Sequence, residues 1–317
     1  MFEEDNINAE EKKQAPKKKA ASNKKVTTTT TKRKPVVKKK PSVAESHETA
    51  TENSDVMNYL DLPSNGRLGY PRTIEYRDMY MGDESMLSTA TDENYYKVLN
   101  KVLKSMLGNP TFFYDMTLLD RDYLLVWIWA NSFSSKRQLR VTCPHCNTRE
   151  DLTIDLSSLD VTDINSDIEQ YLPFEMELKS GHKIHLDLQR VKHELEVEEW
   201  VKDHIDEEGN LESSADLANS LHLAAMEIEG HNDVPLEAKI DWAKKNIRST
   251  EMGQIRMFHE YFSYGITDQI KHTCSNEECG EESIYTVPFR VEDFLQPEPS
   301  GSFEDLLQRN KESRDES

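Results

Sequence analysis

The residues of this chain best suited to chemistry are its four cysteines, which form two pairs. Cys143 and Cys146 are separated by two residues, and Cys274 and Cys279 by four. Two facing turns that each present two thiolates can surround one metal ion, and zinc held by four cysteines is tetrahedral with no open coordination position. The spacing therefore predicts a structural zinc site formed by all four cysteines.

An internal repeat surrounds the two pairs. Residues 138–143 match residues 269–274 in character at an offset of 131 (269 minus 138), except that Val141 aligns with His272. An apolar segment follows each pair, at residues 152–154 and 284–287. Each half is thus predicted to be a strand, a cysteine turn and a returning strand, and Gly280 helps the longer turn to close.

Other uses of the cysteines are weaker but remain open. Buried free thiols need no paired spacing, and two disulfides are disfavoured in a reducing compartment. A redox-active dithiol of the thioredoxin type opens a helix, whereas here a strand follows each pair. His145 and His272 adjoin the cysteines and could replace one ligand, although the four-cysteine set is the simplest.

Charge divides the chain into a basic segment and an acidic body. Residues 1–50 hold 13 of the 39 Lys/Arg and 7 of the 59 Asp/Glu, which leaves 26 basic and 52 acidic residues and a net charge of −26 beyond residue 50. We predict a disordered basic arm over residues 1–57 and a disordered tail over 297–317. The arm could contact DNA, RNA or an acidic surface, whereas the body repels phosphate.

No apolar run of 18 residues and no signal peptide is present in this sequence. Membrane insertion and export are therefore not predicted, and we expect the chain to fold in the cytoplasm.

Two amphipathic patterns precede the first cysteine pair. A strand is expected over residues 72–77, and apolar residues at helical spacing predict a helix over 95–107. A second helix, over 118–133, is expected to begin after Thr117 with Asp120 in a capping-box position. Because residues 123–129 are apolar nearly all round, we expect them to be buried, either in this chain or against a partner.

The region between the cysteine pairs is predicted to contain a hairpin and then helices. Residues 174–178 and 183–188 alternate on either side of Gly181, and residues 191–264 are mostly helical, with one apolar stripe running from Leu217 to Ile228. The predicted fold class is α+β, with a zinc-ribbon-like core from two cysteine knuckles, N-terminal helices, and a helical insertion between the knuckles. Its parts are residues 58–160, 161–268 and 269–296.

We find no pattern typical of an enzyme. His182 and His185 are predicted to point to opposite faces of a hairpin, so they are not a metal pair. The sequence has no phosphate-binding glycine loop, nucleophile elbow or zinc-protease motif. A cluster of carboxylates is interpreted as solvated charge on an exposed helix: Glu194, Glu196, Glu198 and Glu199.

The order of several short motifs resembles one protein family. They are Leu-Pro-Ser-Asn-Gly at 62–66 before a strand, Gly-Asp-Glu at 82–84 before an amphipathic helix, an apolar helix that ends in Ser-Phe-Ser, and Val-Thr-Cys-Pro-His-Cys at 141–146. Together, over residues 58–160, they resemble the baseplate hub proteins of T-even-type contractile phages. The resemblance implies a virion or assembly protein that binds other baseplate or tail proteins, located in the tail baseplate and, during assembly, in the host cytoplasm.

The alternative is a phage-encoded zinc-ribbon regulator that binds nucleic acid through the basic arm and a knuckle. Nucleic-acid-binding ribbons carry Lys, Arg and aromatic residues around their knuckles. The second knuckle instead holds acidic residues, namely Glu277, Glu278, Glu281 and Glu282. Nucleic acid is therefore not expected to bind through the folded body.

Overall fold

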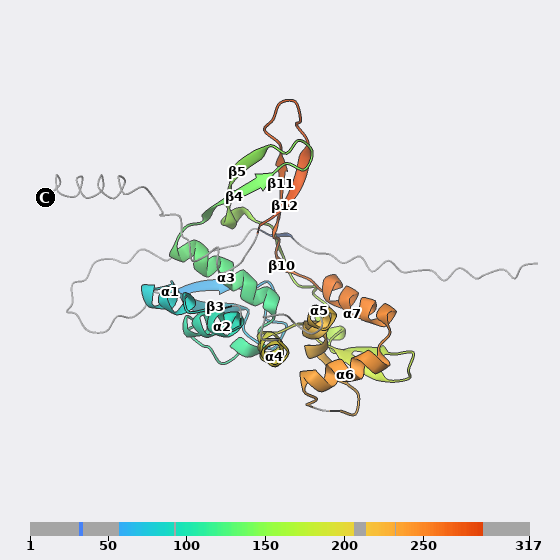
Figure 1. Cartoon of the computed structure of the whole chain (residues 1–317). Helices are drawn as coiled ribbons and strands as arrows, with labels where there is room; N and C mark the ends of the chain where they lie inside the picture. Colours follow the sequence, from blue (N-terminus) through green and yellow to red (C-terminus); the bar gives the residue numbers. More distant parts are fainter. Residues whose placement is uncertain (1–31, 34–56, 92, 206–213, 232, 288–317) are drawn as a thin grey trace, which may run out of the picture.

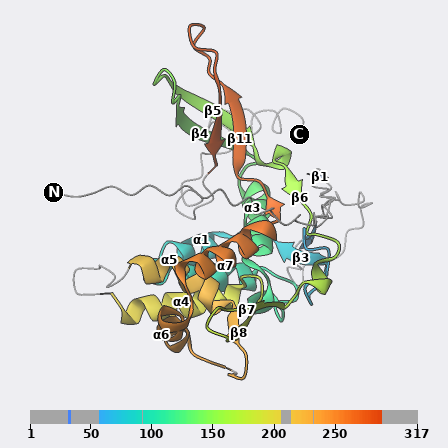
Figure 2. The ribbon, with the colours of Figure 1, turned by 90° about the vertical axis from the view of Figure 1, so that its right-hand side faces the viewer.

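The structure is a computed structural model, and it describes residues 32–33, 57–91, 93–205, 214–231 and 233–287. Helices and small antiparallel sheets form a body, and two hairpins project together from one end of it in both views (Figures 1 and 2). The predicted α+β class is confirmed.

Seven helices lie in the described part of the chain: α1 (Met81–Leu87), α2 (Tyr95–Ser105), α3 (Leu118–Ser132), α4 (Val191–Asp203), α5 (Ser214–Ala224), α6 (Leu236–Asn246) and α7 (Ser249–Tyr261). The strands are β1 (Lys32–Arg33), β2 (Met57–Asp61), β3 (Thr73–Arg77), β4 (Lys136–Thr142), β5 (Arg149–Asp155), β6 (Val161–Thr162), β7 (Phe174–Glu177), β8 (Lys183–Leu186), β9 (Met226–Ile228), β10 (Gly265–Ile266), β11 (Gln269–Thr273) and β12 (Glu282–Thr286). They form five antiparallel groups, ordered β2-β3, β4-β5, β11-β12, β7-β8-β9 and β1-β6-β10.

The predicted helix at 95–107 is α2, and its apolar stripe faces the core. Leu99, Val102 and Leu103 are buried, and the helix ends at Ser105. Beyond that residue, the backbone of residues 106–108 pairs with β3, since the Met106 carbonyl accepts a hydrogen bond from the Arg77 N–H at 2.9 Å. Because α2 ends at Ser105, the backbone after it is free to form hydrogen bonds with the edge of β3.

The second predicted helix is α3, which lies beneath the projecting hairpins (Figures 1 and 2). Thr117 is its N-cap, and its hydroxyl accepts a hydrogen bond from the Asp120 N–H. Every residue from 123 to 129 is buried within this chain, each at 5% exposure or less. The apolar run is therefore core, and the alternative of a partner-facing surface is wrong for these residues.

The middle region contains the predicted hairpin and helices, with one correction. β7 pairs with β8, and the turn between them contains Gly181 at φ +84°. The stripe expected to continue as a helix to Ile228 instead ends at Ala224, and β9 follows it. Ile228 pairs with Ile184 of β8, so a third strand of the sheet replaces the last helical turn.

One hydrophobic core runs through the N-terminal and middle regions. It includes Leu99 of α2, Ile128 of α3, Trp200 of α4, Ile240 of α6 and Ile255 of α7. The hairpins add little beyond Ile154 and Val287. The main core is thus in the helical body, not in a zinc ribbon, because the paired cysteine hairpins are too small to bury much apolar surface.

A buried ion pair crosses this core, and it corrects the interpretation of the acidic cluster. Glu194 of α4 binds the Arg121 guanidinium of α3, and the Asn100 amide donates to the same carboxylate at 2.9 Å. The Glu198 carboxylate accepts a hydrogen bond from the Lys97 N–H at 3.1 Å. Both glutamates are buried at 7% exposure, so the prediction of solvated charge is wrong for them.

The segment predicted as a disordered arm contributes one described element. Lys32–Arg33 forms β1, antiparallel to β6, so the prediction of disorder is wrong for these two residues. Met57 already belongs to β2. The other residues of the predicted arm, and the predicted tail at 297–317, lie outside the described part of the chain.

Candidate metal centre

The two projecting hairpins have the same construction around their cysteines. The Cys143 N–H donates to the Thr148 carbonyl at 2.8 Å, and the Cys274 N–H donates to the Glu281 carbonyl at 3.0 Å. Asn147 and Gly280 each follow the second cysteine of a pair and take φ values of +60° and +58°. Each turn therefore contains one residue in the left-handed backbone conformation, which glycine and asparagine adopt most readily.

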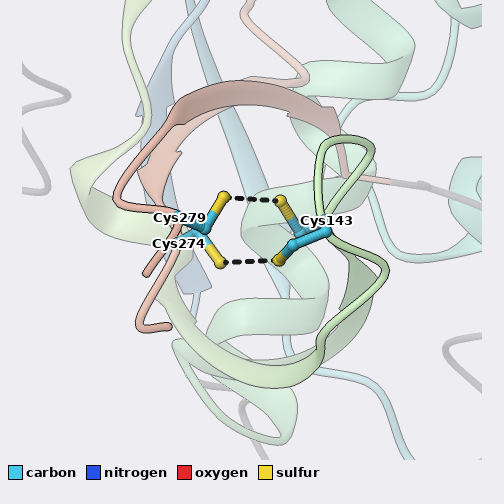
Figure 3. Close-up of side chains that lie close together, drawn as sticks. Cys143, Cys274 and Cys279 are labelled. Atoms are coloured by element: carbon cyan, nitrogen blue, oxygen red, sulfur yellow. Dashed lines mark hydrogen bonds between the residues drawn. The ribbon is translucent and has the colours of Figure 1, made fainter. Parts of the chain in front are cut away.

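These turns bring the four predicted ligands together, as Figure 3 shows for the side chains of Cys143, Cys274 and Cys279. The Cys143 sulfur lies 3.9 Å from that of Cys279, and the Cys146 sulfur lies 3.6 Å from that of Cys274. All four sulfur atoms lie within 4.8 Å of one another. Each of the two measured separations joins a cysteine of the first hairpin to a cysteine of the second. The sulfur cluster therefore connects the two halves of the repeat.

The sulfur spacing fits a tetrahedral metal site. Zinc–sulfur bonds of about 2.3 Å place tetrahedral ligands about 3.8 Å apart, close to the two measured separations. A disulfide requires sulfurs at about 2.05 Å, and all four cysteines are free. Cys143 and Cys274 are buried, while Cys146 and Cys279 are half-buried. The cluster can hold one metal ion between the two cysteine turns.

The pKa values of two of the thiols, Cys146 and Cys274, shift in opposite directions. The Thr148 side chain, whose hydroxyl oxygen lies 3.1 Å from the Cys146 sulfur, lowers the pKa of Cys146 to about 6. The Asn276 N–H favours the thiolate of Cys274, but burial and the Glu150 carboxylate outweigh it and raise the pKa of Cys274. Thiolates this close repel one another, and a divalent cation supplies the charge that allows all four to ionise.

Outside the sulfurs, Glu150 joins the two hairpins. Its carboxylate is 2.7 Å from the Nε2 atom of His272 and accepts a hydrogen bond from the Ser275 N–H at 3.0 Å. The contact with His272 holds the pKa of Glu150 at about 2. Glu150 is the second residue of β5, the returning strand of the first hairpin, and it positions the cysteine turn of the second hairpin.

Sequence reasoning did not identify Glu150. The available signal was His272, the one position where the repeat breaks, because a polar residue there needs a polar partner. The structure assigns His272 to Glu150 and places His145 on the surface, so neither histidine belongs to the group of potential ligands in the described residues. The possibility that a histidine replaces a cysteine ligand therefore has no support in this geometry.

His182 and His185 are not a metal pair either. His182 packs edge-on against the Trp242 ring at 5.4 Å between centroids, whereas His185 lies on β8 near the Glu175 carboxylate, at 3.9 Å. Among the described residues, only the four cysteines form a cluster that can bind a metal.

Comparison with known proteins identifies the class of this chain. A family model described as T4 bacteriophage base plate protein matches residues 56–296. This range covers most of the chain, so the protein belongs to this family of structural components of the phage tail. No curated protein and no solved structure matches it.

The match agrees with the resemblance found in residues 58–160 and extends it to residue 296, beyond the second cysteine pair. The family implies binding to other baseplate proteins and a non-enzymatic role. Within the part of the chain that the structure describes, no helix is long and apolar enough to cross a membrane.

Proposed function

We propose that this protein is a structural or assembly protein of the baseplate hub of a contractile phage tail. The observation that carries the proposal is the family match over residues 56–296, which includes the helical body and both cysteine turns. Its partners are other hub or tail proteins, and its location is the virion baseplate, with the host cytoplasm during assembly. Its activity is recognition rather than catalysis.

Within this function, Cys143, Cys146, Cys274 and Cys279 hold a structural zinc ion. The support is the sulfur spacing and the matched turns. Four thiolates fill the coordination sphere of zinc, so the ion stabilises the structure and has no position for a substrate. Its role is to hold together two hairpins that bury little apolar surface of their own.

The charge of the knuckles argues against the alternative of a nucleic-acid regulator. The second knuckle presents Glu277, Glu278, Glu281 and Glu282 around its two cysteines, and the chain beyond residue 50 carries a net charge of −26, from 26 basic and 52 acidic residues. Phosphate binding through this surface is unfavourable wherever electrostatic forces operate.

Metal content tests the zinc proposal. Elemental analysis of the freshly purified, reduced full chain should give one zinc per chain, and Cys274→Ser should lose most of it. His145→Ala is the matched control, because His145 lies in the first cysteine turn but is exposed, and it should keep its zinc. Less than about half an equivalent in the unmodified chain would contradict the proposal.

Co-purification tests the hub proposal. The full chain is expressed together with the other tail proteins of the phage and captured by an affinity tag, and recovery of a hub protein at near-stoichiometric amount is expected. DNA binding is measured in parallel by gel shift at low and high salt. Tight, salt-sensitive DNA binding without recovery of any tail protein would overturn the hub assignment in favour of the regulator.

A further inference from the structure

We propose that the outer edge of β6 is a docking site for a basic extended segment. In the isolated protein, the chain's own residues at Lys32–Arg33 occupy this site, held by charge in addition to main-chain hydrogen bonds. The proposal concerns a surface away from the cysteine cluster and does not depend on the baseplate function. It rests on the strand pairing, on the charges of the two segments and on their connection in the chain.

The first step is the geometry of the edge. β6 lies in the middle of its sheet, with β10 along one side and β1 along the other. Gly265 and Ile266 of β10 pair with Thr162 and Val161, so the body itself covers only one edge of β6. The other edge receives Lys32–Arg33 in antiparallel register. An edge of this kind offers unpaired N–H and C=O groups that another extended segment can bind.

The second step is charge. Residues 150–178 contain nine Asp/Glu and no Lys or Arg, and β6 lies near the middle of this stretch, between Asp160 and Asp163. Residues 32–40 contain six Lys/Arg and no Asp or Glu. Lys32 and Arg33, the first two residues of this basic segment, therefore pair with a strand in a stretch whose Lys, Arg, Asp and Glu residues are all acidic. Opposite net charges on neighbouring segments attract each other, and salt screens this attraction.

The third step is the local sequence around β1. Five consecutive threonines at 27–31 precede it, and Pro35 follows it after one residue. Threonine favours extended backbone, and proline has no N–H with which to continue a strand ladder. The pattern suits a short strand at this point, and it is absent from the lysine runs at 12–13 and 17–19.

The fourth step decides between this chain and a second copy as the source of the strand. Twenty-three residues, 34–56, connect β1 to β2. A chain of this length can reach up to about 80 Å, which is ample for docking on its own body. A tethered segment has an effective concentration on the order of 1 mM, far above micromolar protein in solution, so the segment of the same chain outcompetes that of another.

Hydrogen–deuterium exchange of the full chain tests the proposal, with the peptides that contain β6 as the readout. Consecutive N–H groups of a strand point to opposite edges, and the Asp160 carbonyl bonds to the Thr267 N–H beside β10, so Val161 is the residue of β6 that faces β1. Lys32→Glu/Arg33→Glu should therefore speed exchange at Val161 by about threefold or more. Lys12→Glu/Lys13→Glu is the control, because it makes the same change of charge within residues 1–50 but away from β1. Exchange at β6 in this variant should equal that of the unmodified protein. Equal exchange rates at β6 in the two variants would overturn the proposal.

Salt and dilution complete the design. Raising the salt concentration from about 0.05 M to about 0.5 M should speed exchange at β6 in the unmodified protein, because the Debye length falls to a few Å. Exchange at β6 should be the same at about 1 µM and about 50 µM protein if the segment docks within its own chain. Loss of protection on dilution, together with dimers in light scattering, would overturn the intramolecular assignment and identify a second copy as the donor. Zinc content and circular dichroism show that each variant is folded.

Discussion

Asp120 lies fully buried at the start of α3, and its carboxylate is held by hydrogen bonds from uncharged groups. Its carboxylate accepts hydrogen bonds from the Ser64 N–H at 3.2 Å and the Tyr70 hydroxyl at 2.6 Å. Burial outweighs these bonds and raises the pKa of Asp120 to about 6. Since the unfolded value is about 3.9, the folded state binds this proton more tightly, and the contribution to stability falls as pH rises from about 4 to about 6.

Replacing Asp120 with Asn should remove this pH dependence. The unfolding free energy of Asp120→Asn relative to the unmodified protein should rise by about 2 kcal/mol between pH 4.5 and pH 7, since one pKa unit corresponds to about 1.4 kcal/mol. Urea unfolding at several pH values measures it, and loss of metal at low pH affects both proteins alike. Asp203→Asn, at an exposed position of α4, is measured in parallel as a control for the loss of one surface charge. A difference that stays constant with pH for Asp120→Asn would contradict the prediction.

Single residues were predictable from the sequence where the deciding pattern is local. The cysteines were found because spacing within a turn is visible along the chain, and Thr117 because a cap lies next to its helix. Glu194 was misread because its partner Arg121 is 73 residues away. Glu150 was missed for the same reason, since His272 is 122 residues away. A carboxylate has the same appearance in a sequence whether it is solvated or paired.

At the scale of elements, the two cysteine hairpins differ from the helices in what stabilises them. Along β11 only intermediate and exposed positions occur, while each of β4, β5 and β12 has a single buried position. The hairpins are held to each other by the sulfur cluster and by Glu150. The helices, in contrast, share one apolar core.

Removing the metal should therefore open the hairpins and spare the body. In the zinc-loaded protein treated with a chelator, we expect trypsin to cleave first at Arg140, Arg149 and Lys271, while α2 and α3 stay intact, because structural zinc supplies the folding energy of small metal domains. Mass spectrometry of the early fragments measures this, with magnesium-loaded chelator as the control. Early cleavage within α4 to α7 would show that the helical insertion also depends on the metal.

The elements themselves were predicted well where periodicity is strong, as in α2, α3 and the β7-β8 hairpin. β9 was predicted as the end of a helix because Leu221, Ala224 and Ile228 keep helical spacing. Pairing with β8 outweighs that pattern, and such long-range pairing is not encoded in the local spacing.

For the whole molecule, the insertion between the knuckles is not a separate unit. α4 packs on α2 and on the 3-10 turn before α3, and the Arg121–Glu194 pair lies in that contact, with side-chain exposures of 6% and 8%. The sequence indicated an insertion between the cysteine pairs but not how it packs. Motifs mark the positions of segments along the chain, and they do not show which apolar faces meet in the fold. The helical body should therefore unfold as one cooperative unit.

Arg121→Leu tests this coupling. It leaves the Glu194 carboxylate buried without its cation and should cost about 3–5 kcal/mol, whereas Arg121→Leu/Glu194→Leu should recover most of the loss. Thermal unfolding, followed by probes in α2 and in α6, should show both regions melting together at a lower temperature. Arg140→Leu removes an exposed pair with Asp151 and should have little effect. Separate melting of the two regions would contradict a shared core.

The distance along the chain between the two cysteine pairs also determines when, during synthesis, the metal site can form. Cys146 and Cys274 are 128 residues apart, although their sulfurs lie 3.6 Å apart in the folded protein. A ribosome adds about 5–20 residues per second, so the first pair waits roughly 6–26 seconds for the second to be made. During that interval the two early thiols have no partners across the site. All four cysteines exist only after α7, the last helix of the described residues, has been made, so a metal ion bound by all four marks a chain in which α1 to α7 are already synthesised.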